Sequence, residues 1–264
     1  MKHFNSILLG LTCICGLGFA QQEDQSPYKD RGFYIKLGSG ASFATTAHVS
    51  ASPATWDPAL EGYNSKLGTV PIFLTGLGYD SPYVSGDITA SYRPDYSYSK
   101  FQTPTTNDTP GQLGEKTRRF DLDVTSLMFS LYLNGRGFDA LNWGVGDGSV
   151  FPFLGAGVGV SQMKVYNFRS TGLPPLAGLE PLASFSSENE YSKDYRFTYQ
   201  LMAGLEYRFK DVFSFSLGYR WFDPSRFDGP SYMRTDEGDA FQATSPWKIS
   251  FGANEVFLEF KVLL

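Results

Sequence analysis

The sequence predicts an all-β fold, an eight-stranded antiparallel up-and-down transmembrane β-barrel with long extracellular loops. Apolar and polar residues alternate with a period of two in many segments, as in strands whose two faces meet different surroundings. Aromatic residues make up 16% of the 264 residues, and 28 glycines accompany them, a composition that favours β-structure. After residue 20 no apolar run reaches the length of about 20 residues that a membrane-spanning helix needs. We therefore expect strands to cross the membrane.

Eight segments carry the alternation. They cover residues 33–43, 69–79, 84–93, 120–133, 154–161, 195–209, 213–221 and 255–264. In the first segment, Phe33 and Leu37 lie on one face and Lys36 lies on the other. In the third segment, Ile88 and Tyr92 alternate with serine and aspartate. The second segment alternates more weakly. The fifth alternates aliphatic residues with glycine, and the eighth alternates apolar with charged residues.

The fourth segment changes phase within itself. Its apolar residues before Ser126 are Phe120, Leu122 and Val124, whereas after it they are Leu127, Phe129, Leu131 and Leu133. One extra residue in a strand moves the alternation by one position. The sequence therefore predicts a β-bulge near Ser126.

The sixth and seventh segments form a hairpin whose register can be derived. One face of the sixth runs from Tyr195 to Phe209 through aromatic and aliphatic residues, and one face of the seventh begins at Phe213. Apolar residues must lie opposite apolar residues, so Phe209 must face Phe213 across a three-residue turn. Leu205 then faces Leu217. A two-residue turn would place every polar residue opposite an aromatic one.

The connections between these segments alternate in length. Long stretches cover about 45–68, 102–116, 169–193 and 223–246, whereas 80–82 and 210–212 are short and 135–150 is intermediate. Outer-membrane barrels have this asymmetry, with long loops outside the cell and short turns in the periplasm. An even number of strands places both termini on the periplasmic side.

Side-chain volume indicates which face points inward. The interior of an eight-stranded barrel is just wide enough for side chains to fill. One face carries Phe, Tyr, Trp and Leu, and the other carries glycine, serine and scattered charges. Only the second face fits inside, so the apolar face is predicted to lie against lipid. The alternative, a soluble barrel or β-sandwich, would bury the rings and leave charges such as Arg196 outside.

The first residues have the features of an export signal. Lys2 and His3 precede an apolar run that ends at Gly18-Phe19-Ala20, a small-x-small pattern. The run is too short and too rich in glycine for a spanning helix, and a buried N-terminal helix is the alternative. We expect a cleaved signal peptide at 1–20 and a barrel domain at 21–264, which reaches the outer membrane of a Gram-negative cell by Sec-dependent export.

Removal of this signal leaves few residues for catalysis. Cys13 and Cys15 lie within it, and neither has the preceding residues of a lipid-attachment site. His48 is then the remaining one of two histidines, and no serine spacing around it suggests a triad. We therefore expect no catalytic residue, no metal site, no cofactor and no enzyme activity.

Charge narrows the range of partners. The formal net charge is −5, and loss of Lys2 makes it one unit more negative. This balance argues against nucleic acid, which requires a basic surface. The expected partners are outer-membrane lipid and lipopolysaccharide, the outer-membrane assembly machinery and an extracellular ligand of unknown kind.

Four segments share their order and spacing with a known family. They read FPFLGAGVGV at 151–160, YQLMAGLEY at 199–207, FSLGYR at 215–220 and ANEV at 253–256. Through them the chain resembles the opacity-protein/OmpA-like eight-stranded outer-membrane barrels, also described as the porin family. The resemblance implies a surface antigen, adhesin or envelope protein, and some members are small-molecule channels. Such barrels usually end in Phe or Trp, which the assembly machinery reads, whereas this chain ends in Leu264.

Charged residues on the inward face are the candidate functional residues. We predict a lumen charge network of Lys36, Arg196, Glu206, Arg208, Arg220, Glu255, Glu259 and Lys261. Because the last two strands are neighbours, Arg220 should approach Glu255 or Glu259. Charges with little water around them must be paired, so we expect the lumen to be plugged rather than open.

The connection between the fifth and sixth segments is apolar and rich in proline. Its candidate partner-contact residues are Leu173, Pro174, Pro175, Leu176, Leu179 and Leu182, although such a loop can also pack on its neighbours. The predicted function is a non-enzymatic, structural or surface-antigen barrel of the outer membrane, which binds a partner through its extracellular loops. The alternative is a channel for small solutes or small hydrophobic molecules that resembles OmpW-type barrels.

Overall fold

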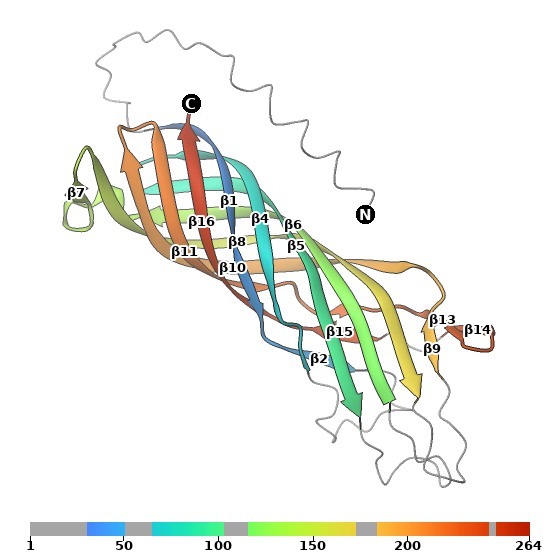
Figure 1. Cartoon of the computed structure of the whole chain (residues 1–264). Coiled ribbons are helices and arrows are strands. Elements are labelled where there is room, and N and C mark those ends of the chain that lie inside the picture. Colours follow the sequence, from blue (N-terminus) through green and yellow to red (C-terminus); the bar gives the residue numbers. More distant parts are fainter. Residues whose placement is uncertain (1–30, 51–64, 103–115, 173–183, 243–246) are drawn as a thin grey trace.

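The computed structural model describes residues 31–50, 65–102, 116–172, 184–242 and 247–264, in which eight long strands close into one barrel (Figure 1). The strands are β1 (Gly32–Ala44), β4 (Thr69–Asp80), β5 (Val84–Gln102), β6 (Lys116–Asn134), β8 (Gly148–Gly172), β10 (Tyr191–Phe209), β11 (Phe213–Asp223) and β16 (Ala253–Leu263). Each pairs antiparallel with the next along the chain, and β16 pairs with β1. The predicted eight-stranded up-and-down barrel is confirmed.

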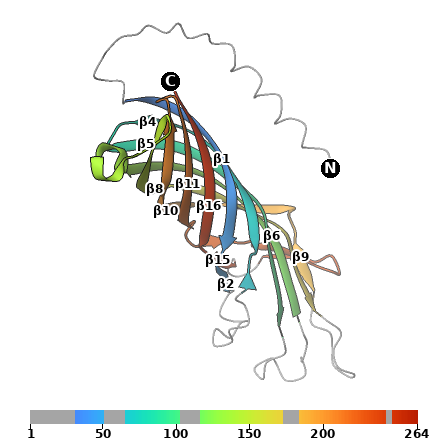
Figure 2. The same ribbon diagram turned by 60° about the vertical axis from the view of Figure 1, so that its left-hand side comes forward.

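Short elements extend the two ends of the barrel. At one end lie β2 (Thr46–Ser50), β3 (Ser65–Lys66), β9 (Phe185–Ser187), β12 (Phe227–Asp228), β13 (Tyr232–Thr235), β14 (Ala240–Gln242) and β15 (Lys248–Ser250). At the other end lie the C-terminus, two 3₁₀ helices, η3 (Gly135–Gly137) and η4 (Asp139–Leu141), and the strand β7 (Trp143–Val145) (Figures 1 and 2). Within the described residues, no helix is long and apolar enough to cross a membrane.

The β10–β11 hairpin has the predicted register. Phe209 pairs with Phe213, and Leu205 pairs with Leu217. Lys210 and Asp211 in the turn adopt positive φ angles of 48° and 54°, the backbone region that tight hairpin turns use to match the twist of their strands. The rule that apolar residues lie opposite apolar residues was therefore sufficient to derive this pairing.

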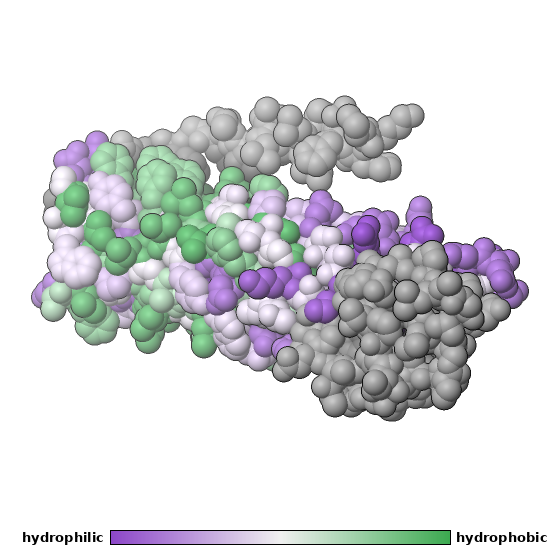
Figure 3. Space-filling model, turned by 60° about the horizontal axis from the view of Figure 1, so that its bottom comes forward, coloured by the Kyte–Doolittle hydropathy of each residue, from purple (hydrophilic) through white to green (hydrophobic). Residues whose placement is uncertain are grey.

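The barrel divides along its axis into two halves with opposite polarity patterns. We call the part that carries residues 81–83 and 210–212 the turn-side half and the part that carries the long connections the loop-side half. The row of inward residues that contains Ser126 forms the border between them. In the turn-side half the outward residues are apolar and exposed, including Phe33, Leu37, Leu77, Ile88, Phe129, Leu131, Leu154, Leu205, Leu217 and Leu258. Apolar residues gather at this end of the surface, whereas hydrophilic residues lie toward the other end (Figure 3).

The loop-side half has an apolar interior. Its buried cluster includes Tyr96, Tyr98, Phe120, Leu122, Val124, Met163, Val165, Phe168, Phe222, Trp247, Ile249 and Phe251. Many of its outward positions carry polar residues instead, such as Ser97 and Arg119, which are exposed, although Tyr191 and Tyr195 on β10 are exposed there too. This half is therefore built like a soluble β-protein, with its hydrophobic core inside.

The β-bulge predicted near Ser126 is wrong. Ser126 pairs in continuous register with Ser91 on β5 and with Ser161 on β8. Alternate residues of β6 from Phe120 to Tyr132 all point inward and are buried. The strand keeps its phase, and the apolar side chains change sides because the interior changes from polar to apolar at this row.

Two bulges do occur, both in the loop-side half. The β5–β6 register shifts between Arg93 and Tyr96, where Asp95 has a φ of 59°. The β6–β8 register shifts between Arg119 and Asp121. The first bulge allows Tyr96 to point inward and join the apolar cluster, so β5 continues well past residue 93, where the alternation predicted its end.

Candidate functional site: the charged lumen

Close packing fills the lumen of the turn-side half. A Cβ atom on Gly155 would lie 2.6 Å from the ring of Tyr132, and one on Gly218 would lie 2.4 Å from the ring of Phe257. Glycine at these inward positions therefore makes room for large side chains from neighbouring strands. Tyr132 and Phe257 belong to a small buried cluster with Phe153 and Met202.

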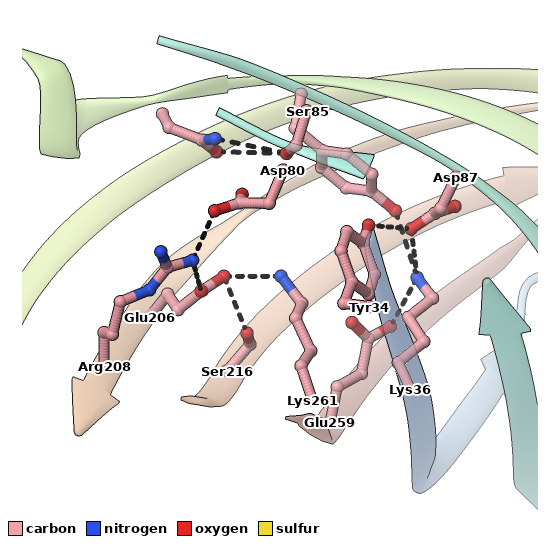
Figure 4. Close-up of polar contacts among 12 residues, drawn as sticks. Tyr34, Lys36, Asp80, Ser85, Asp87, Glu206, Arg208, Ser216, Glu259 and Lys261 are labelled. Carbon is pink, nitrogen blue, oxygen red and sulfur yellow. Dashed lines mark hydrogen bonds and ion pairs between the residues drawn. The ribbon is translucent and has the colours of Figure 1, made fainter. Parts of the chain in front are cut away.

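One ion-pair cluster surrounds Lys36 on β1. Its Nζ lies 2.6 Å from Asp87 on β5 and 3.4 Å from Glu259 on β16. The Tyr34 hydroxyl donates a 3.0 Å hydrogen bond to Asp87, and Lys36 donates to the Tyr132 hydroxyl at 3.3 Å. Four strands, β1, β5, β6 and β16, thus meet through one buried ammonium group, whose donors are all directed at acceptors (Figure 4).

A second cluster joins β4, β10 and β16 nearer the turns. Arg208 lies 2.5 Å from Asp80 and 3.6 Å from Glu206, and Lys261 lies 2.5 Å from Glu206 (Figure 4). Asp80 also pairs with Arg136 at 2.9 Å. The cluster alternates positive and negative groups across the lumen, so each charge has an opposite neighbour.

A third cluster lies at the border between the halves and is centred on Glu255. Arg93 donates to both of its carboxylate oxygens, at 2.5 and 3.1 Å. Arg220 forms an ion pair with it at 3.3 Å, and the Ser42 hydroxyl donates at 2.7 Å. Arg220 therefore lies beside one of the two carboxylates that the strand order predicted for it.

The structure places all but one of the predicted charges in these clusters. Arg196 is the exception, because it lies in the loop-side half with a side chain 36% exposed, 2.7 Å from Asp194 and 3.1 Å from Asp228. Asp87 and Arg93 belong to the clusters but were not among the candidates, although the alternation of their strand places both on the inward face. Asp80, also absent from the predicted set, is the last residue of β4 beside the turn. Alternation predicts the inward or outward direction of a side chain less well at such a strand end.

Acids and bases nearly balance in this lumen. The clusters contain five buried acids, Asp80, Asp87, Glu206, Glu255 and Glu259, and five buried bases, Lys36, Arg93, Arg208, Arg220 and Lys261. Arg136, whose side chain is 8% exposed, adds a sixth base beside Asp80. Buried charges are tolerated when they are paired and hydrogen-bonded. The arrangement can cross-link strands across the barrel and fill the space through which water would otherwise pass.

The remaining predictions concern the signal peptide, the apolar contact loop and metal binding. The signal peptide and the candidate contact loop, Leu173–Leu182, lie outside the described residues. Among the residues that the structure does describe, no group of three or more His, Cys, Asp or Glu side chains is placed to hold a metal ion.

Comparisons with known proteins do not confirm the predicted family. No family model matches the chain. A 94-residue stretch is 30% identical to uncharacterized proteins of Brucella abortus and Brucella melitensis, and it covers 36% of this chain and 27% of each relative. The match thus spans about a quarter of the length of those relatives.

Solved outer-membrane proteins share low similarity with this chain. Neisserial surface protein A (NspA) has a TM-score of 0.43 and 14% identity, covering 88% of this chain and 97% of that one. OprG from Pseudomonas aeruginosa has a TM-score of 0.41 and 8% identity over the same shares. The fold assignment rests on the strand pairing described above.

Proposed function

We propose that the chain is an integral outer-membrane barrel with a closed lumen, of structural or surface-antigen type, and that it is not an enzyme. The observation that carries this proposal is the continuous apolar outer face of the turn-side half around a charged interior. Soluble monomers rarely expose contiguous apolar patches beyond a few hundred Å². A face of leucine and aromatic side chains on every strand is stable against lipid acyl chains.

The closed barrel supports insertion in a second way. Backbone groups within lipid must all be hydrogen-bonded inside the protein, and a barrel without edges meets this condition. Tyr219 and Trp221 stand at the border of the apolar face on β11, and Tyr79 and Phe33 stand near its other margin. Aromatic residues at both margins are typical of the interfacial girdles of membrane barrels.

The lumen favours a closed barrel over a channel. Ion pairs and the Tyr132–Phe257 cluster occupy the interior of the turn-side half, and the apolar cluster fills the loop-side half. We infer that small solutes do not pass, and that partner binding falls to the loops, including the apolar stretch 173–182. A non-enzymatic role agrees with His48 as the remaining histidine after signal removal.

The mature chain, refolded into phosphatidylcholine vesicles, tests both parts of this proposal. Insertion should give a heat-modifiable, protease-resistant species, and planar-bilayer recordings should show no stable porin-like steps. An aggregated chain that never partitions into vesicles would refute the membrane assignment. Stable conductance steps of the wild type would refute the closed lumen and support the channel alternative.

A further inference from the structure

A polar pocket of about 370 Å³ lies on the outer wall of the barrel, at the border between the halves. It is lined by four stretches of the chain, represented by Thr45 and His48, Tyr199, Asp223 and Arg226, and Ser250. Its volume is in the range of small-ligand sites. It is separate from the lumen clusters, because Tyr199 and Asp223 occupy outward positions of β10 and β11.

On β1 and β11 the pocket stands one row beyond the apolar outer face, whereas on β10 the exposed aromatic residues continue past Tyr199 to Phe197 and Tyr195. Tyr199 pairs directly with Asp223, and the next outward pair lies between Leu201 and Trp221. On β1, the last outward apolar residue is Phe43, and Thr45 is the next outward position. In a membrane, the row beyond the acyl chains is the row of the lipid headgroups.

Hydrogen bonds hold the polar groups of the pocket in place. The Tyr199 hydroxyl donates to one oxygen of Asp223 at 3.0 Å, and the Ser225 amide donates to the other at 2.8 Å. Ser225 has a φ of 59°, a backbone region that non-glycine residues seldom adopt. The hydroxyl oxygen of Thr45 accepts a 2.9 Å bond from the Gly252 amide, which ties the first stretch to the last.

The chemistry of the lining fits a sugar. Hydroxyl, carboxylate, imidazole and guanidinium groups supply both donors and acceptors, as the hydroxyls of a saccharide require. The Tyr199 ring packs edge-on against Trp221 at 5.4 Å between centroids, so one aromatic wall can cover the apolar face of a sugar ring. Arg226 adds a guanidinium suited to a phosphate substituent.

We propose that this pocket binds the saccharide headgroup of an outer-leaflet glycolipid of the lipopolysaccharide type. The proposal rests on the outer-membrane location proposed above, because there a layer of sugars lies directly over the acyl chains that face Leu201 and Trp221. The pocket would hold one headgroup beside the β1, β11 and β16 wall.

The test uses the mature chain in phosphatidylcholine vesicles with and without rough lipopolysaccharide, and the readout is the midpoint of the heat-modifiability transition. Lipopolysaccharide should raise the midpoint of the wild type. Tyr199→Phe and Arg226→Gln should each lose at least half of that rise. The matched controls are Tyr195→Phe, an outward tyrosine on the same strand, and Arg169→Gln, an exposed arginine of β8, and both should keep it.

The other outcomes are also decisive. The pocket proposal is overturned if the wild type inserts but its midpoint does not change with lipopolysaccharide. It is also overturned if the pocket variants respond as the controls do. Either result leaves the membrane barrel intact. A chain that fails to insert would instead overturn the proposed function. In lipopolysaccharide-free vesicles, a rise of equal size on addition of a soluble glucosamine disaccharide would overturn the glycolipid as the source of the sugar.

Discussion

The two halves of the barrel use one backbone pattern for opposite purposes. On β6, Leu122 points inward and is fully buried, whereas Leu131, nine residues along the same strand, points outward and is 53% exposed. The period of two decides which residues share a face, but the surroundings decide which face must be apolar. The row at which the polarity inverts therefore marks the border between two environments of the barrel.

Arg93 lies at this border and contacts both kinds of interior. Its guanidinium bonds Glu255 of the charged lumen, and it stacks 3.8 Å from the ring centroid of Phe222 in the apolar cluster. A planar guanidinium is suited to this position, because it combines a bidentate contact with carboxylate and a stacking contact with an aromatic face. The two interiors thus meet without an unpaired charge at Arg93.

The largest expected effect comes from removing the carboxylate at this border. Glu255→Ala leaves Arg93 and Arg220 without their shared partner, and we expect a loss of about 3–5 kcal/mol in the free energy of unfolding. Denaturant titration in lipid vesicles measures this loss. Glu188→Ala is the control, since Glu188 pairs with Arg234 at 3.2 Å on the exposed surface, where such pairs contribute about 0–1 kcal/mol. Equal losses would contradict a buried, tightly paired lumen.

Truncation of leucine should have different effects in the two halves. Leu122→Ala opens a cavity in the apolar cluster and should cost about 2–5 kcal/mol in the free energy of unfolding. Leu131→Ala should cost clearly less, because acyl chains can fill the space beside an outward residue. The same denaturant titration compares the two variants. A larger loss at Leu131 would show that the interior of the loop-side half is assigned wrongly.

An arginine on the outer face should destabilise the turn-side half more than the loop-side half, and this difference should be smaller than those above. Leu205→Arg places a cation on the apolar outer face and should reduce the free energy of insertion by about 2–4 kcal/mol. Ser97→Arg, at an exposed outward position of the loop-side half, should change it by at most about 0.5 kcal/mol. The fraction of heat-modifiable protein after refolding with vesicles reports both, and comparable losses would contradict the inversion.

Much of the turn-side half was predictable from alternation alone. Each strand there has one face of large apolar residues and one of small or charged residues, so the register of the β10–β11 hairpin followed from matching like faces. The lumen bases and acids on β10, β11 and β16 followed from the same alternation. Asp87 and Arg93 could have been added by applying it to β5.

The loop-side half could not be predicted in this way. An apolar face with a period of two has the same sequence pattern whether it faces a core or lipid. Alternation therefore places Phe120 and Leu122 on the same face of the barrel as Leu127, and only a bulge at Ser126 reconciles the two sets. Only the three-dimensional pairing shows that the two sets of side chains point to opposite faces of one continuous strand.

The inversion itself is tested most directly by scanning cysteines along the outward positions of β6. The variants replace Arg119, Asp121, Asp123, Thr125, Leu127, Phe129, Leu131 and Leu133 in a chain that lacks residues 1–20 and with them Cys13 and Cys15. In vesicles, a water-soluble thiol reagent should label the positions up to Thr125, whereas a fluorophore at Leu127 and beyond should be quenched by lipid-borne quenchers. Aqueous labelling at every position along the strand would contradict the account. So would failure of the thiol reagent to label Arg119, Asp121, Asp123 and Thr125, because a bulge at Ser126 would turn these side chains into the barrel.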